Sequence, residues 1–405
     1  MSENIPVIVH GHEKVRNYQN MNHIVKRIGI LTGVFAAALC VFFLANNRWN
    51  SGQDQAVYMD MEAASLPSIT VQMLGRDMNR LYGYRQEMNT TAAGENLTIL
   101  PEDRALTVDI TGGGVTGISY EVRSVDRARL VERTEVSDWQ QTQQGIAATL
   151  PIQNLLTKER EYQLIIQLDT ENYGSVYYYT RILWTDSAQH ARDMVDLAAD
   201  FSIKTFDYEQ AKSLTTYLET SPSEDNSTFG HTSIHSSFSQ LTWGKMNMQP
   251  EGNVEIRLKE LDGVMCGVQL SYQAKRQGDG AEETYEVEED FTLKWNELRI
   301  YMMQYDRTVN QIFAGDRSEY SGKRILLGIT QDDRVELVKS AGGKTLAYRV
   351  NRDLWSFEPE DRRAVRIFSF RDDDSTDVRS NYDHHDVRIL SVEDDGDVDF
   401  LVYGY

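Results

Sequence analysis

An uncharged apolar run near the N-terminus constrains this chain more than any other feature. Residues 28–45, IGILTGVFAAALCVFFLA, contain no charged side chain, and charged residues bracket them on both sides. At 1.5 Å per residue, a helix of this length is about 27 Å long, close to the hydrocarbon thickness of a bilayer. Apolar side chains occupy every face of such a helix, which favours a membrane span over a buried core helix.

The charges beside this run predict its orientation. Four Lys or Arg precede it within residues 1–27, whereas only Arg48 follows within about twenty residues. The positive-inside rule then makes residues 1–27 a cytoplasmic tail and residues 28–45 a single-pass signal anchor in the plasma membrane, with an extracellular body. A cleaved signal peptide is the rival interpretation, but no small-x-small site follows the apolar core cleanly.

The body is acidic and poor in cysteine. The chain of 405 residues carries 62 Asp and Glu against 41 Lys and Arg, a formal charge of −21. Nucleic-acid binding needs a basic face, so we exclude it as a function. The two cysteines are Cys40, inside the apolar run, and Cys266. The body therefore has no cysteine pair for a disulfide or a zinc site, and Cys266, in an apolar stretch, reads as a buried, inert thiol.

The hydrophobic pattern predicts a mainly β fold after an irregular stalk at residues 46–67. From residue 68 to 185, short stretches rich in Val, Ile, Thr and Tyr recur with turn residues between them, typical of a β-sandwich. Within them, Leu156-Thr-Lys-Glu-Arg-Glu-Tyr162 resembles the segment that precedes the sixth strand of fibronectin type III and immunoglobulin-like domains, although the family's proline is absent. The resemblance implies a binding or spacer module in which the Tyr162 hydroxyl pins a corner. Tyr162 as an ordinary strand aromatic is the alternative.

The period changes between residues 186 and 220, where apolar residues stand three and four apart. This spacing predicts two helical stretches, the second capped by Asp207. A polar stretch follows, at which we place a domain boundary. In residues 221–315, strand-like stretches return, and they predict an antiparallel sheet domain with a hairpin turn at residues 277–280.

Residues 316–405 predict short strands joined by acidic turns. The run from Ala347 to Asp361, which contains Leu354-Trp355-Ser-Phe357, is similar to β-propeller blades (resemblance over about 320–405). A propeller closes with at least four blades of roughly forty residues, and about two fit here. The chain moreover stops on an apolar strand, so we expect a propeller-like region that is truncated. A small, complete sheet domain is the alternative.

Two acidic segments near the C-terminus are the candidates for metal chemistry. Carboxylates and imidazoles gather at Asp383, His384 and Asp386, as hard or borderline cations require. Alternating carboxylates at Asp395, Asp397 and Asp399 suggest a calcium site. Neither segment contains a calcium loop or a zinc-helix motif. The alternatives are a solvated acidic loop for the first and an ordinary turn for the second.

These features favour a non-enzymatic protein of the cell envelope. We expect a membrane-anchored extracytoplasmic binding, scaffold or regulatory protein whose β domains bind an envelope protein or a wall polymer, with no cofactor. In layout it resembles the single-pass extracytoplasmic proteins of Gram-positive bacteria that associate with membrane sensor kinases. The alternative is an anchored metal-dependent hydrolase with its site in the C-terminal acidic and histidine-containing region.

Overall fold

The computed structural model describes most of the chain. The described residues are 26, 29–42, 57–58, 66–88, 95–143, 145–153, 156–277, 282–315, 319–321, 324–331, 334–371 and 385–403. The chain divides into two compact units, one N-terminal and one comprising residues 57–315 with 319–405.

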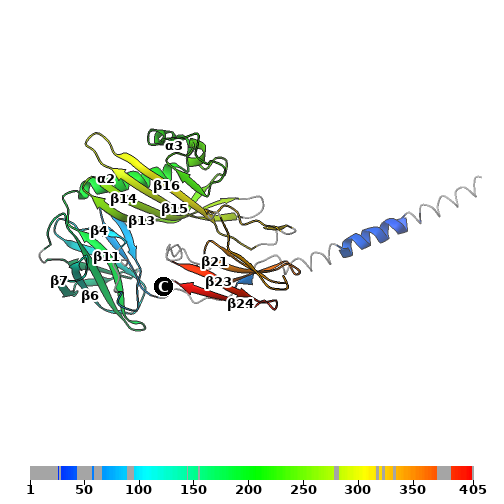
Figure 1. Cartoon of the computed structure of the whole chain (residues 1–405), viewed down its shortest axis with the longest axis horizontal. Helices are drawn as coiled ribbons and strands as arrows, with labels where there is room; N and C mark the ends of the chain where they lie inside the picture. The colour runs from blue at the N-terminus through cyan, green and yellow to red at the C-terminus, as the bar shows by residue number, and fades with distance from the viewer. Residues whose placement is uncertain are drawn as a thin grey trace, which may run out of the picture. The chain divides into compact units, whose positions relative to one another are not determined.

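The N-terminal unit contains a helix over residues 29–42 (Figure 1, blue) with exposed side chains. No helix among the described residues combines the length and hydropathy needed to cross a bilayer. Residues 28 and 43–45 of the predicted span lie outside the described residues, so the membrane span stays a prediction.

The second unit confirms the mainly β fold class. Its described strands form four five-stranded and two two-stranded sheets, none of which closes on itself (Figure 1).

Two of the five-stranded sheets lie in residues 68–183 and share one hydrophobic core. Their strand orders are β3-β2-β5-β9-β8 and β4-β11-β10-β6-β7. The strands are β2 (Ser68–Met73), β3 (Arg76–Leu81), β4 (Leu97–Ile99), β5 (Ala105–Thr111), β6 (Val115–Ser124), β7 (Leu130–Glu135), β8 (Trp139–Gln141), β9 (Gly145–Pro151), β10 (Glu161–Thr170) and β11 (Gly174–Leu183). Apolar side chains alternate inward along β5 and β9, as the sequence predicts. The Tyr162 hydroxyl accepts a hydrogen bond from the Thr157 backbone N–H at 3.1 Å.

A third sheet of long antiparallel strands follows, with the order β12-β16-β15-β14-β13. Its strands and the helical segments before and within it are α2 (Ala188–Lys204), α3 (Tyr208–Ala211), η2 (Lys212–Thr216), β12 (His231–Ser233), α4 (Phe238–Leu241), β13 (Gln249–Asp262), β14 (Met265–Gln277), β15 (Glu282–Lys294) and β16 (Tyr301–Gln311). The predicted cap is confirmed, because Asp207 accepts hydrogen bonds from the backbone of Glu209 and Gln210. Strands β14 and β15 pair antiparallel, as the predicted hairpin requires, and residues 278–281 between them lie outside the described residues.

Helix α2 covers one face of this third sheet (Figure 1). Its buried side chains include Met194, Val195 and Phe201, and the Phe201 ring lies 5.7 Å from that of Phe291 and 4.9 Å from that of Tyr305. The same hydrophobic core continues from Ile69 in β2 to Val309 in β16. The boundary predicted after residue 220 therefore does not separate two cores.

The C-terminal part has a smaller core of its own, built on Ala347, Leu354 and Val387. Its main sheet has the order β1-β22-β21-β20-β19, and two hairpins, β17-β18 and β23-β24, accompany it. The strands are β1 (Val57–Tyr58), β17 (Tyr320–Ser321), β18 (Arg324–Ile325), β19 (Leu337–Lys339), β20 (Leu346–Val350), β21 (Asp353–Glu358), β22 (Arg363–Phe368), β23 (Asp386–Val392) and β24 (Val398–Tyr403).

Part of the predicted stalk at residues 46–67 forms a strand, β1, that pairs with a sheet. Val57 and Tyr58 pair in parallel with Val365 and Arg366 of β22, instead of forming a free tether. The prediction failed here because a strand edge binds another backbone through N–H and C=O groups, and this pairing needs no side-chain pattern.

Candidate functional site

The structure places only part of the first predicted metal cluster. Asp383 and His384 lie outside the described residues. Asp386 contacts Arg349, lies 3.0 Å from Arg388 Nη2, and accepts a hydrogen bond from the Tyr403 hydroxyl at 2.8 Å. Partial burial raises the pKa of Asp386, but the Tyr403 hydrogen bond and the Arg349 charge outweigh it and hold the pKa below its ordinary value. Asp386 is thus a structural ion-pair partner.

The second predicted metal site forms an acidic turn between β23 and β24. Asp395 Oδ1 accepts from the Asp397 backbone N–H at 3.3 Å, and Asp399 accepts from the Ser391 hydroxyl at 2.9 Å. Across the described residues, no three His, Cys, Asp or Glu side chains come together as a group that could hold an ion. The hydrolase hypothesis therefore gains no geometric support from this part of the chain.

Cys266 lies in β14 and is almost fully buried. Burial raises the pKa of its thiol to about 12, which keeps it protonated and unreactive at neutral pH. The predicted burial of Cys266 is confirmed.

A polar cavity of about 430 Å³ lies where the β3-containing sheet meets β13. One wall is the edge strand β3, with Asp77 and Arg80, and the opposite wall is residues 253–256 of β13. The outward face of β2 and β5 also lines it, with Thr70, Asp109 and Thr111 among the lining residues. These side chains come from strands far apart in the sequence, so no local sequence motif predicts the cavity.

Asn79 fixes the two walls to each other. Its side chain is fully buried, its Oδ1 accepts from the Leu258 N–H of β13 at 2.8 Å, and its Nδ2 donates to the Leu97 carbonyl at 2.8 Å. The β2–β3 ladder shifts register beside it, and Asn79 has a φ of 49°, in the left-handed region that asparagine tolerates. The bulge therefore turns an amide out of one sheet to bind the edge of another.

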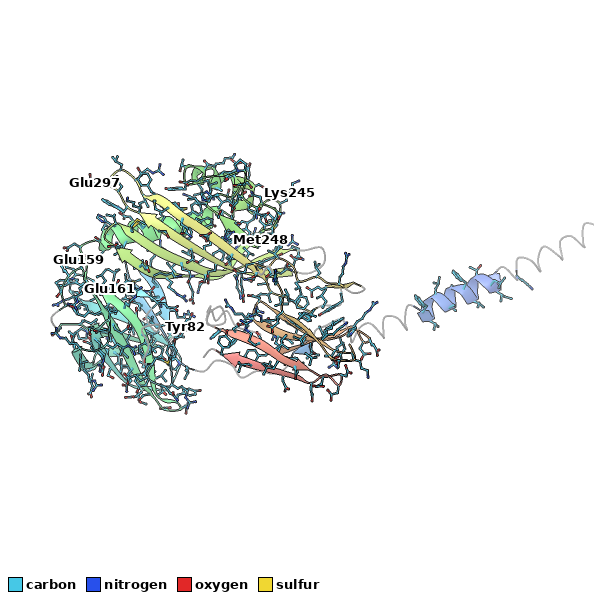
Figure 2. The ribbon with its side chains drawn as sticks, viewed as in Figure 1. Tyr82, Glu159, Glu161, Lys245, Met248 and Glu297 are labelled. Carbon is cyan, nitrogen blue, oxygen red and sulfur yellow. The ribbon has the colours of Figure 1, made fainter. Side chains whose placement is uncertain are left out.

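Two guanidinium groups strengthen this junction. Arg80 Nε lies 3.1 Å from Glu255 Oε1 across the cavity. Arg181 donates from Nη1 to Glu161 (labelled in Figure 2) at 2.9 Å and from Nη2 to the Lys259 carbonyl of β13. Strand β13 is thus bound to the first two sheets by backbone and side-chain contacts.

The cavity has an excess of negative charge. Its charged lining residues are the carboxylates of Asp77, Asp109 and Glu255 and the guanidinium of Arg80. Arg80 is engaged with Glu255, and Asp109 accepts a hydrogen bond from Gln72. The site can therefore hydrogen-bond a polar ligand and favours one with a positive charge.

A second group of polar side chains is buried under α2 and α4. Glu289 and Arg307 are both fully buried, and Tyr305 donates to Glu289 Oε1 at 2.7 Å. Arg307 donates to the carbonyls of Leu241 and Gln240 at 3.0 and 2.9 Å and lies 3.6 Å above the Trp243 ring. Burial raises the pKa of Glu289 above its ordinary value. These contacts attach α4 to β16, so we assign the cluster a structural role.

A third group links the C-terminal part to the third sheet. Arg371 donates to Glu286 of β15 at 2.8 Å and also contacts Asp353 of β21, and all three side chains are nearly buried. Ser369 donates to Asp353 at 2.7 Å. Because one arginine satisfies two buried carboxylates, this group also has a structural role.

No protein-family model matches the sequence, and no curated protein matches it. The functional argument therefore depends on the site itself.

Proposed function

We propose that this protein is a membrane-anchored extracytoplasmic binding protein of the cell envelope, without catalytic activity. Residues 28–45 are the anchor, residues 1–27 face the cytoplasm, and the β-rich body binds a partner protein or wall polymer outside the cell. The uncharged run and the charge bias beside it support the anchor and its orientation.

The cavity between β3 and β13 is the main structural support for the binding role. Carboxylates, hydroxyls and two amides converge there on a volume of about 430 Å³, which suits a small polar group. The excess of carboxylates over the guanidinium of Arg80 also supports binding of a ligand that carries a positive charge.

The strand order supports an immunoglobulin-like assignment for residues 68–185. Lettering the strands in chain order makes β2-β5-β9-β8 the A-B-E-D sheet and β7-β6-β10-β11 the C′-C-F-G sheet. Strand β3 is then an insertion, and β4 is an additional strand that pairs in parallel with β11. The Tyr162 hydrogen bond to Thr157 occupies the place of the tyrosine corner, at the start of the F strand.

The C-terminal sheet supports a propeller-like assignment for residues 316–405 in one respect. Strands β19, β20, β21 and β22 are consecutive, antiparallel and adjacent, which is the arrangement of one propeller blade.

Membrane fractionation tests the anchor. The full chain is expected to stay with membranes after alkaline washing, and external protease is expected to digest the body while leaving a fragment that contains the tail and the anchor, residues 1–45. Recovery of the intact chain in the soluble fraction would refute the anchor.

A photo-crosslinking side chain tests the binding role in the native envelope. Placed at Thr111 in the cavity, it is expected to give a discrete crosslinked product that the same group at Glu102 does not give. Glu102 is exposed and lies outside the cavity lining, which makes it the matched control. Identical products from both positions would remove the support for a cavity ligand.

A further inference from the structure

The cavity lies between two sheet edges. Strand β3 is the outermost strand of its sheet, and β13 is the outermost strand of the third sheet. They meet where the Leu258 N–H binds the Asn79 side chain at 2.8 Å, and the cavity opens beside this contact. Edge strands present backbone N–H and C=O groups that can pair with another chain.

The backbone of β13 points into this space. The Leu258 N–H binds Asn79 and therefore points away from β14. In an antiparallel strand, residues two apart direct their backbone groups to the same side, so the N–H and C=O of Ile256 also point away from β14. Ile256 lines the cavity. The β13–β14 ladder also steps from Glu251 to Glu255, which leaves residues 252–254 outside its regular register.

The charge of the cavity lining determines which kind of polypeptide segment could pair with the β13 edge. Asp77, Asp109 and Glu255 contribute three carboxylates, and Arg80 contributes the one positive charge among the described lining residues. An acidic segment would meet like charges, whereas a lysine or arginine side chain would find carboxylates from two walls.

We propose that the groove between β3 and β13 binds an extended polypeptide segment that carries a lysine or arginine. The segment's backbone pairs with β13 at Ile256, and its basic side chain reaches Asp77 and Asp109. This inference rests on the proposed binding function and adds the class of ligand to it.

Three matched peptide pools test the proposal against the full chain in detergent micelles. Each pool contains acetylated and amidated pentapeptides with Val, Ile or Thr at the outer four positions. The first has lysine at the centre, the second has norleucine, which lacks the ammonium group, and the third has lysine but N-methylated neighbours that cannot donate backbone hydrogen bonds. Calorimetry measures the affinity of each pool.

The lysine pool is expected to bind about tenfold more tightly than each of the other two pools. The double variant Asp77→Asn/Asp109→Asn leaves the Arg80–Glu255 pair in place and is expected to abolish the preference for lysine over norleucine. The control Glu102→Gln is expected to retain it. Equal affinities for lysine and norleucine in the unmodified chain overturn the proposal, as does an unchanged preference in the double variant.

A binding test with a free amine distinguishes failure of this inference from failure of the proposed function. Glucosamine has a positive charge and hydroxyls but no peptide backbone. If it binds in the cavity while none of the peptide pools does, the peptide inference fails and the binding function stands. If neither glucosamine nor any pool binds, and Thr111 gives no specific crosslink, both fail.

Discussion

Replacement of Asn79 tests whether one side chain holds the walls of the cavity together. Alanine removes the amide and places an ordinary residue at a φ of 49°, whereas glycine removes the amide but adopts this φ without strain. The two variants therefore separate the contribution of the hydrogen bonds from that of the backbone conformation.

The structure sets the expected magnitudes. Without the amide, the Leu258 N–H and the Leu97 carbonyl each lose a buried partner at 2.8 Å. An orphaned buried backbone group costs about 1–3 kcal/mol, so Asn79→Gly is expected to lower the free energy of unfolding by roughly 3 kcal/mol. The left-handed conformation adds about 1 kcal/mol for Asn79→Ala.

Urea unfolding of the full chain, followed by tryptophan fluorescence, measures both losses. An unchanged slope against urea would show that the change lies in stability and not in the unfolded state. A loss below about 1 kcal/mol in both variants would refute the bridging role of the amide. Equal losses in the two variants would refute the claim of backbone strain at this position.

Three other perturbations have defined outcomes. Phe201→Ala, at a fully buried position, is expected to lower the free energy of unfolding by about 3–5 kcal/mol in the same assay. Arg371→Ala leaves the carboxylates of Asp353 and Glu286 buried without their shared partner; faster limited proteolysis of the C-terminal part than in the unmodified chain is expected, and an unchanged rate would contradict it. Burial raises the pKa of Glu289 in the folded state. Its contribution to the free energy of unfolding is therefore fully present at pH values below its unfolded-state pKa of about 4.3, and that contribution is lost as the pH rises through the folded-state pKa. Glu289→Gln is therefore expected to lose less stability than the unmodified chain when the pH is raised from about 4 to 8, and equal losses would contradict the assignment.

The features that the sequence predicts well depend on residues close together in the chain. The Asp207 cap joins residues two and three positions apart, and the Tyr162 hydroxyl contacts a backbone group five positions away. The strands of the two-sheet region are predictable for the same reason, because burial imposes an alternation that each strand shows by itself.

The cavity could not be predicted, because its contacts join distant segments. The Asn79–Leu258 bond spans 179 positions, and no periodicity marks either partner. The same limitation applies to Asp386: its partner Arg349 lies 37 positions earlier, so no local pattern in the sequence shows this ion pair. Asp109 lies on the outward face of β5 with Thr107 and Thr111, where an alternating strand ordinarily carries polar side chains, so it gave no local signal.

The charges at the two strand edges oppose non-specific pairing of other chains with the open groove. An exposed edge pairs with any extended chain through its backbone, and natural proteins prevent this by placing charged side chains on the edge. Asp77 and Arg80 on β3 and Glu255 on β13 are such residues. Because carboxylates outnumber the guanidinium, the groove disfavours segments that carry acidic side chains and favours segments that carry basic ones. If this reasoning holds, neutralising Asp77 and Asp109 will abolish the preference for lysine and will also increase self-association of the protein. Light scattering of the double variant beside the Glu102→Gln control measures the second effect.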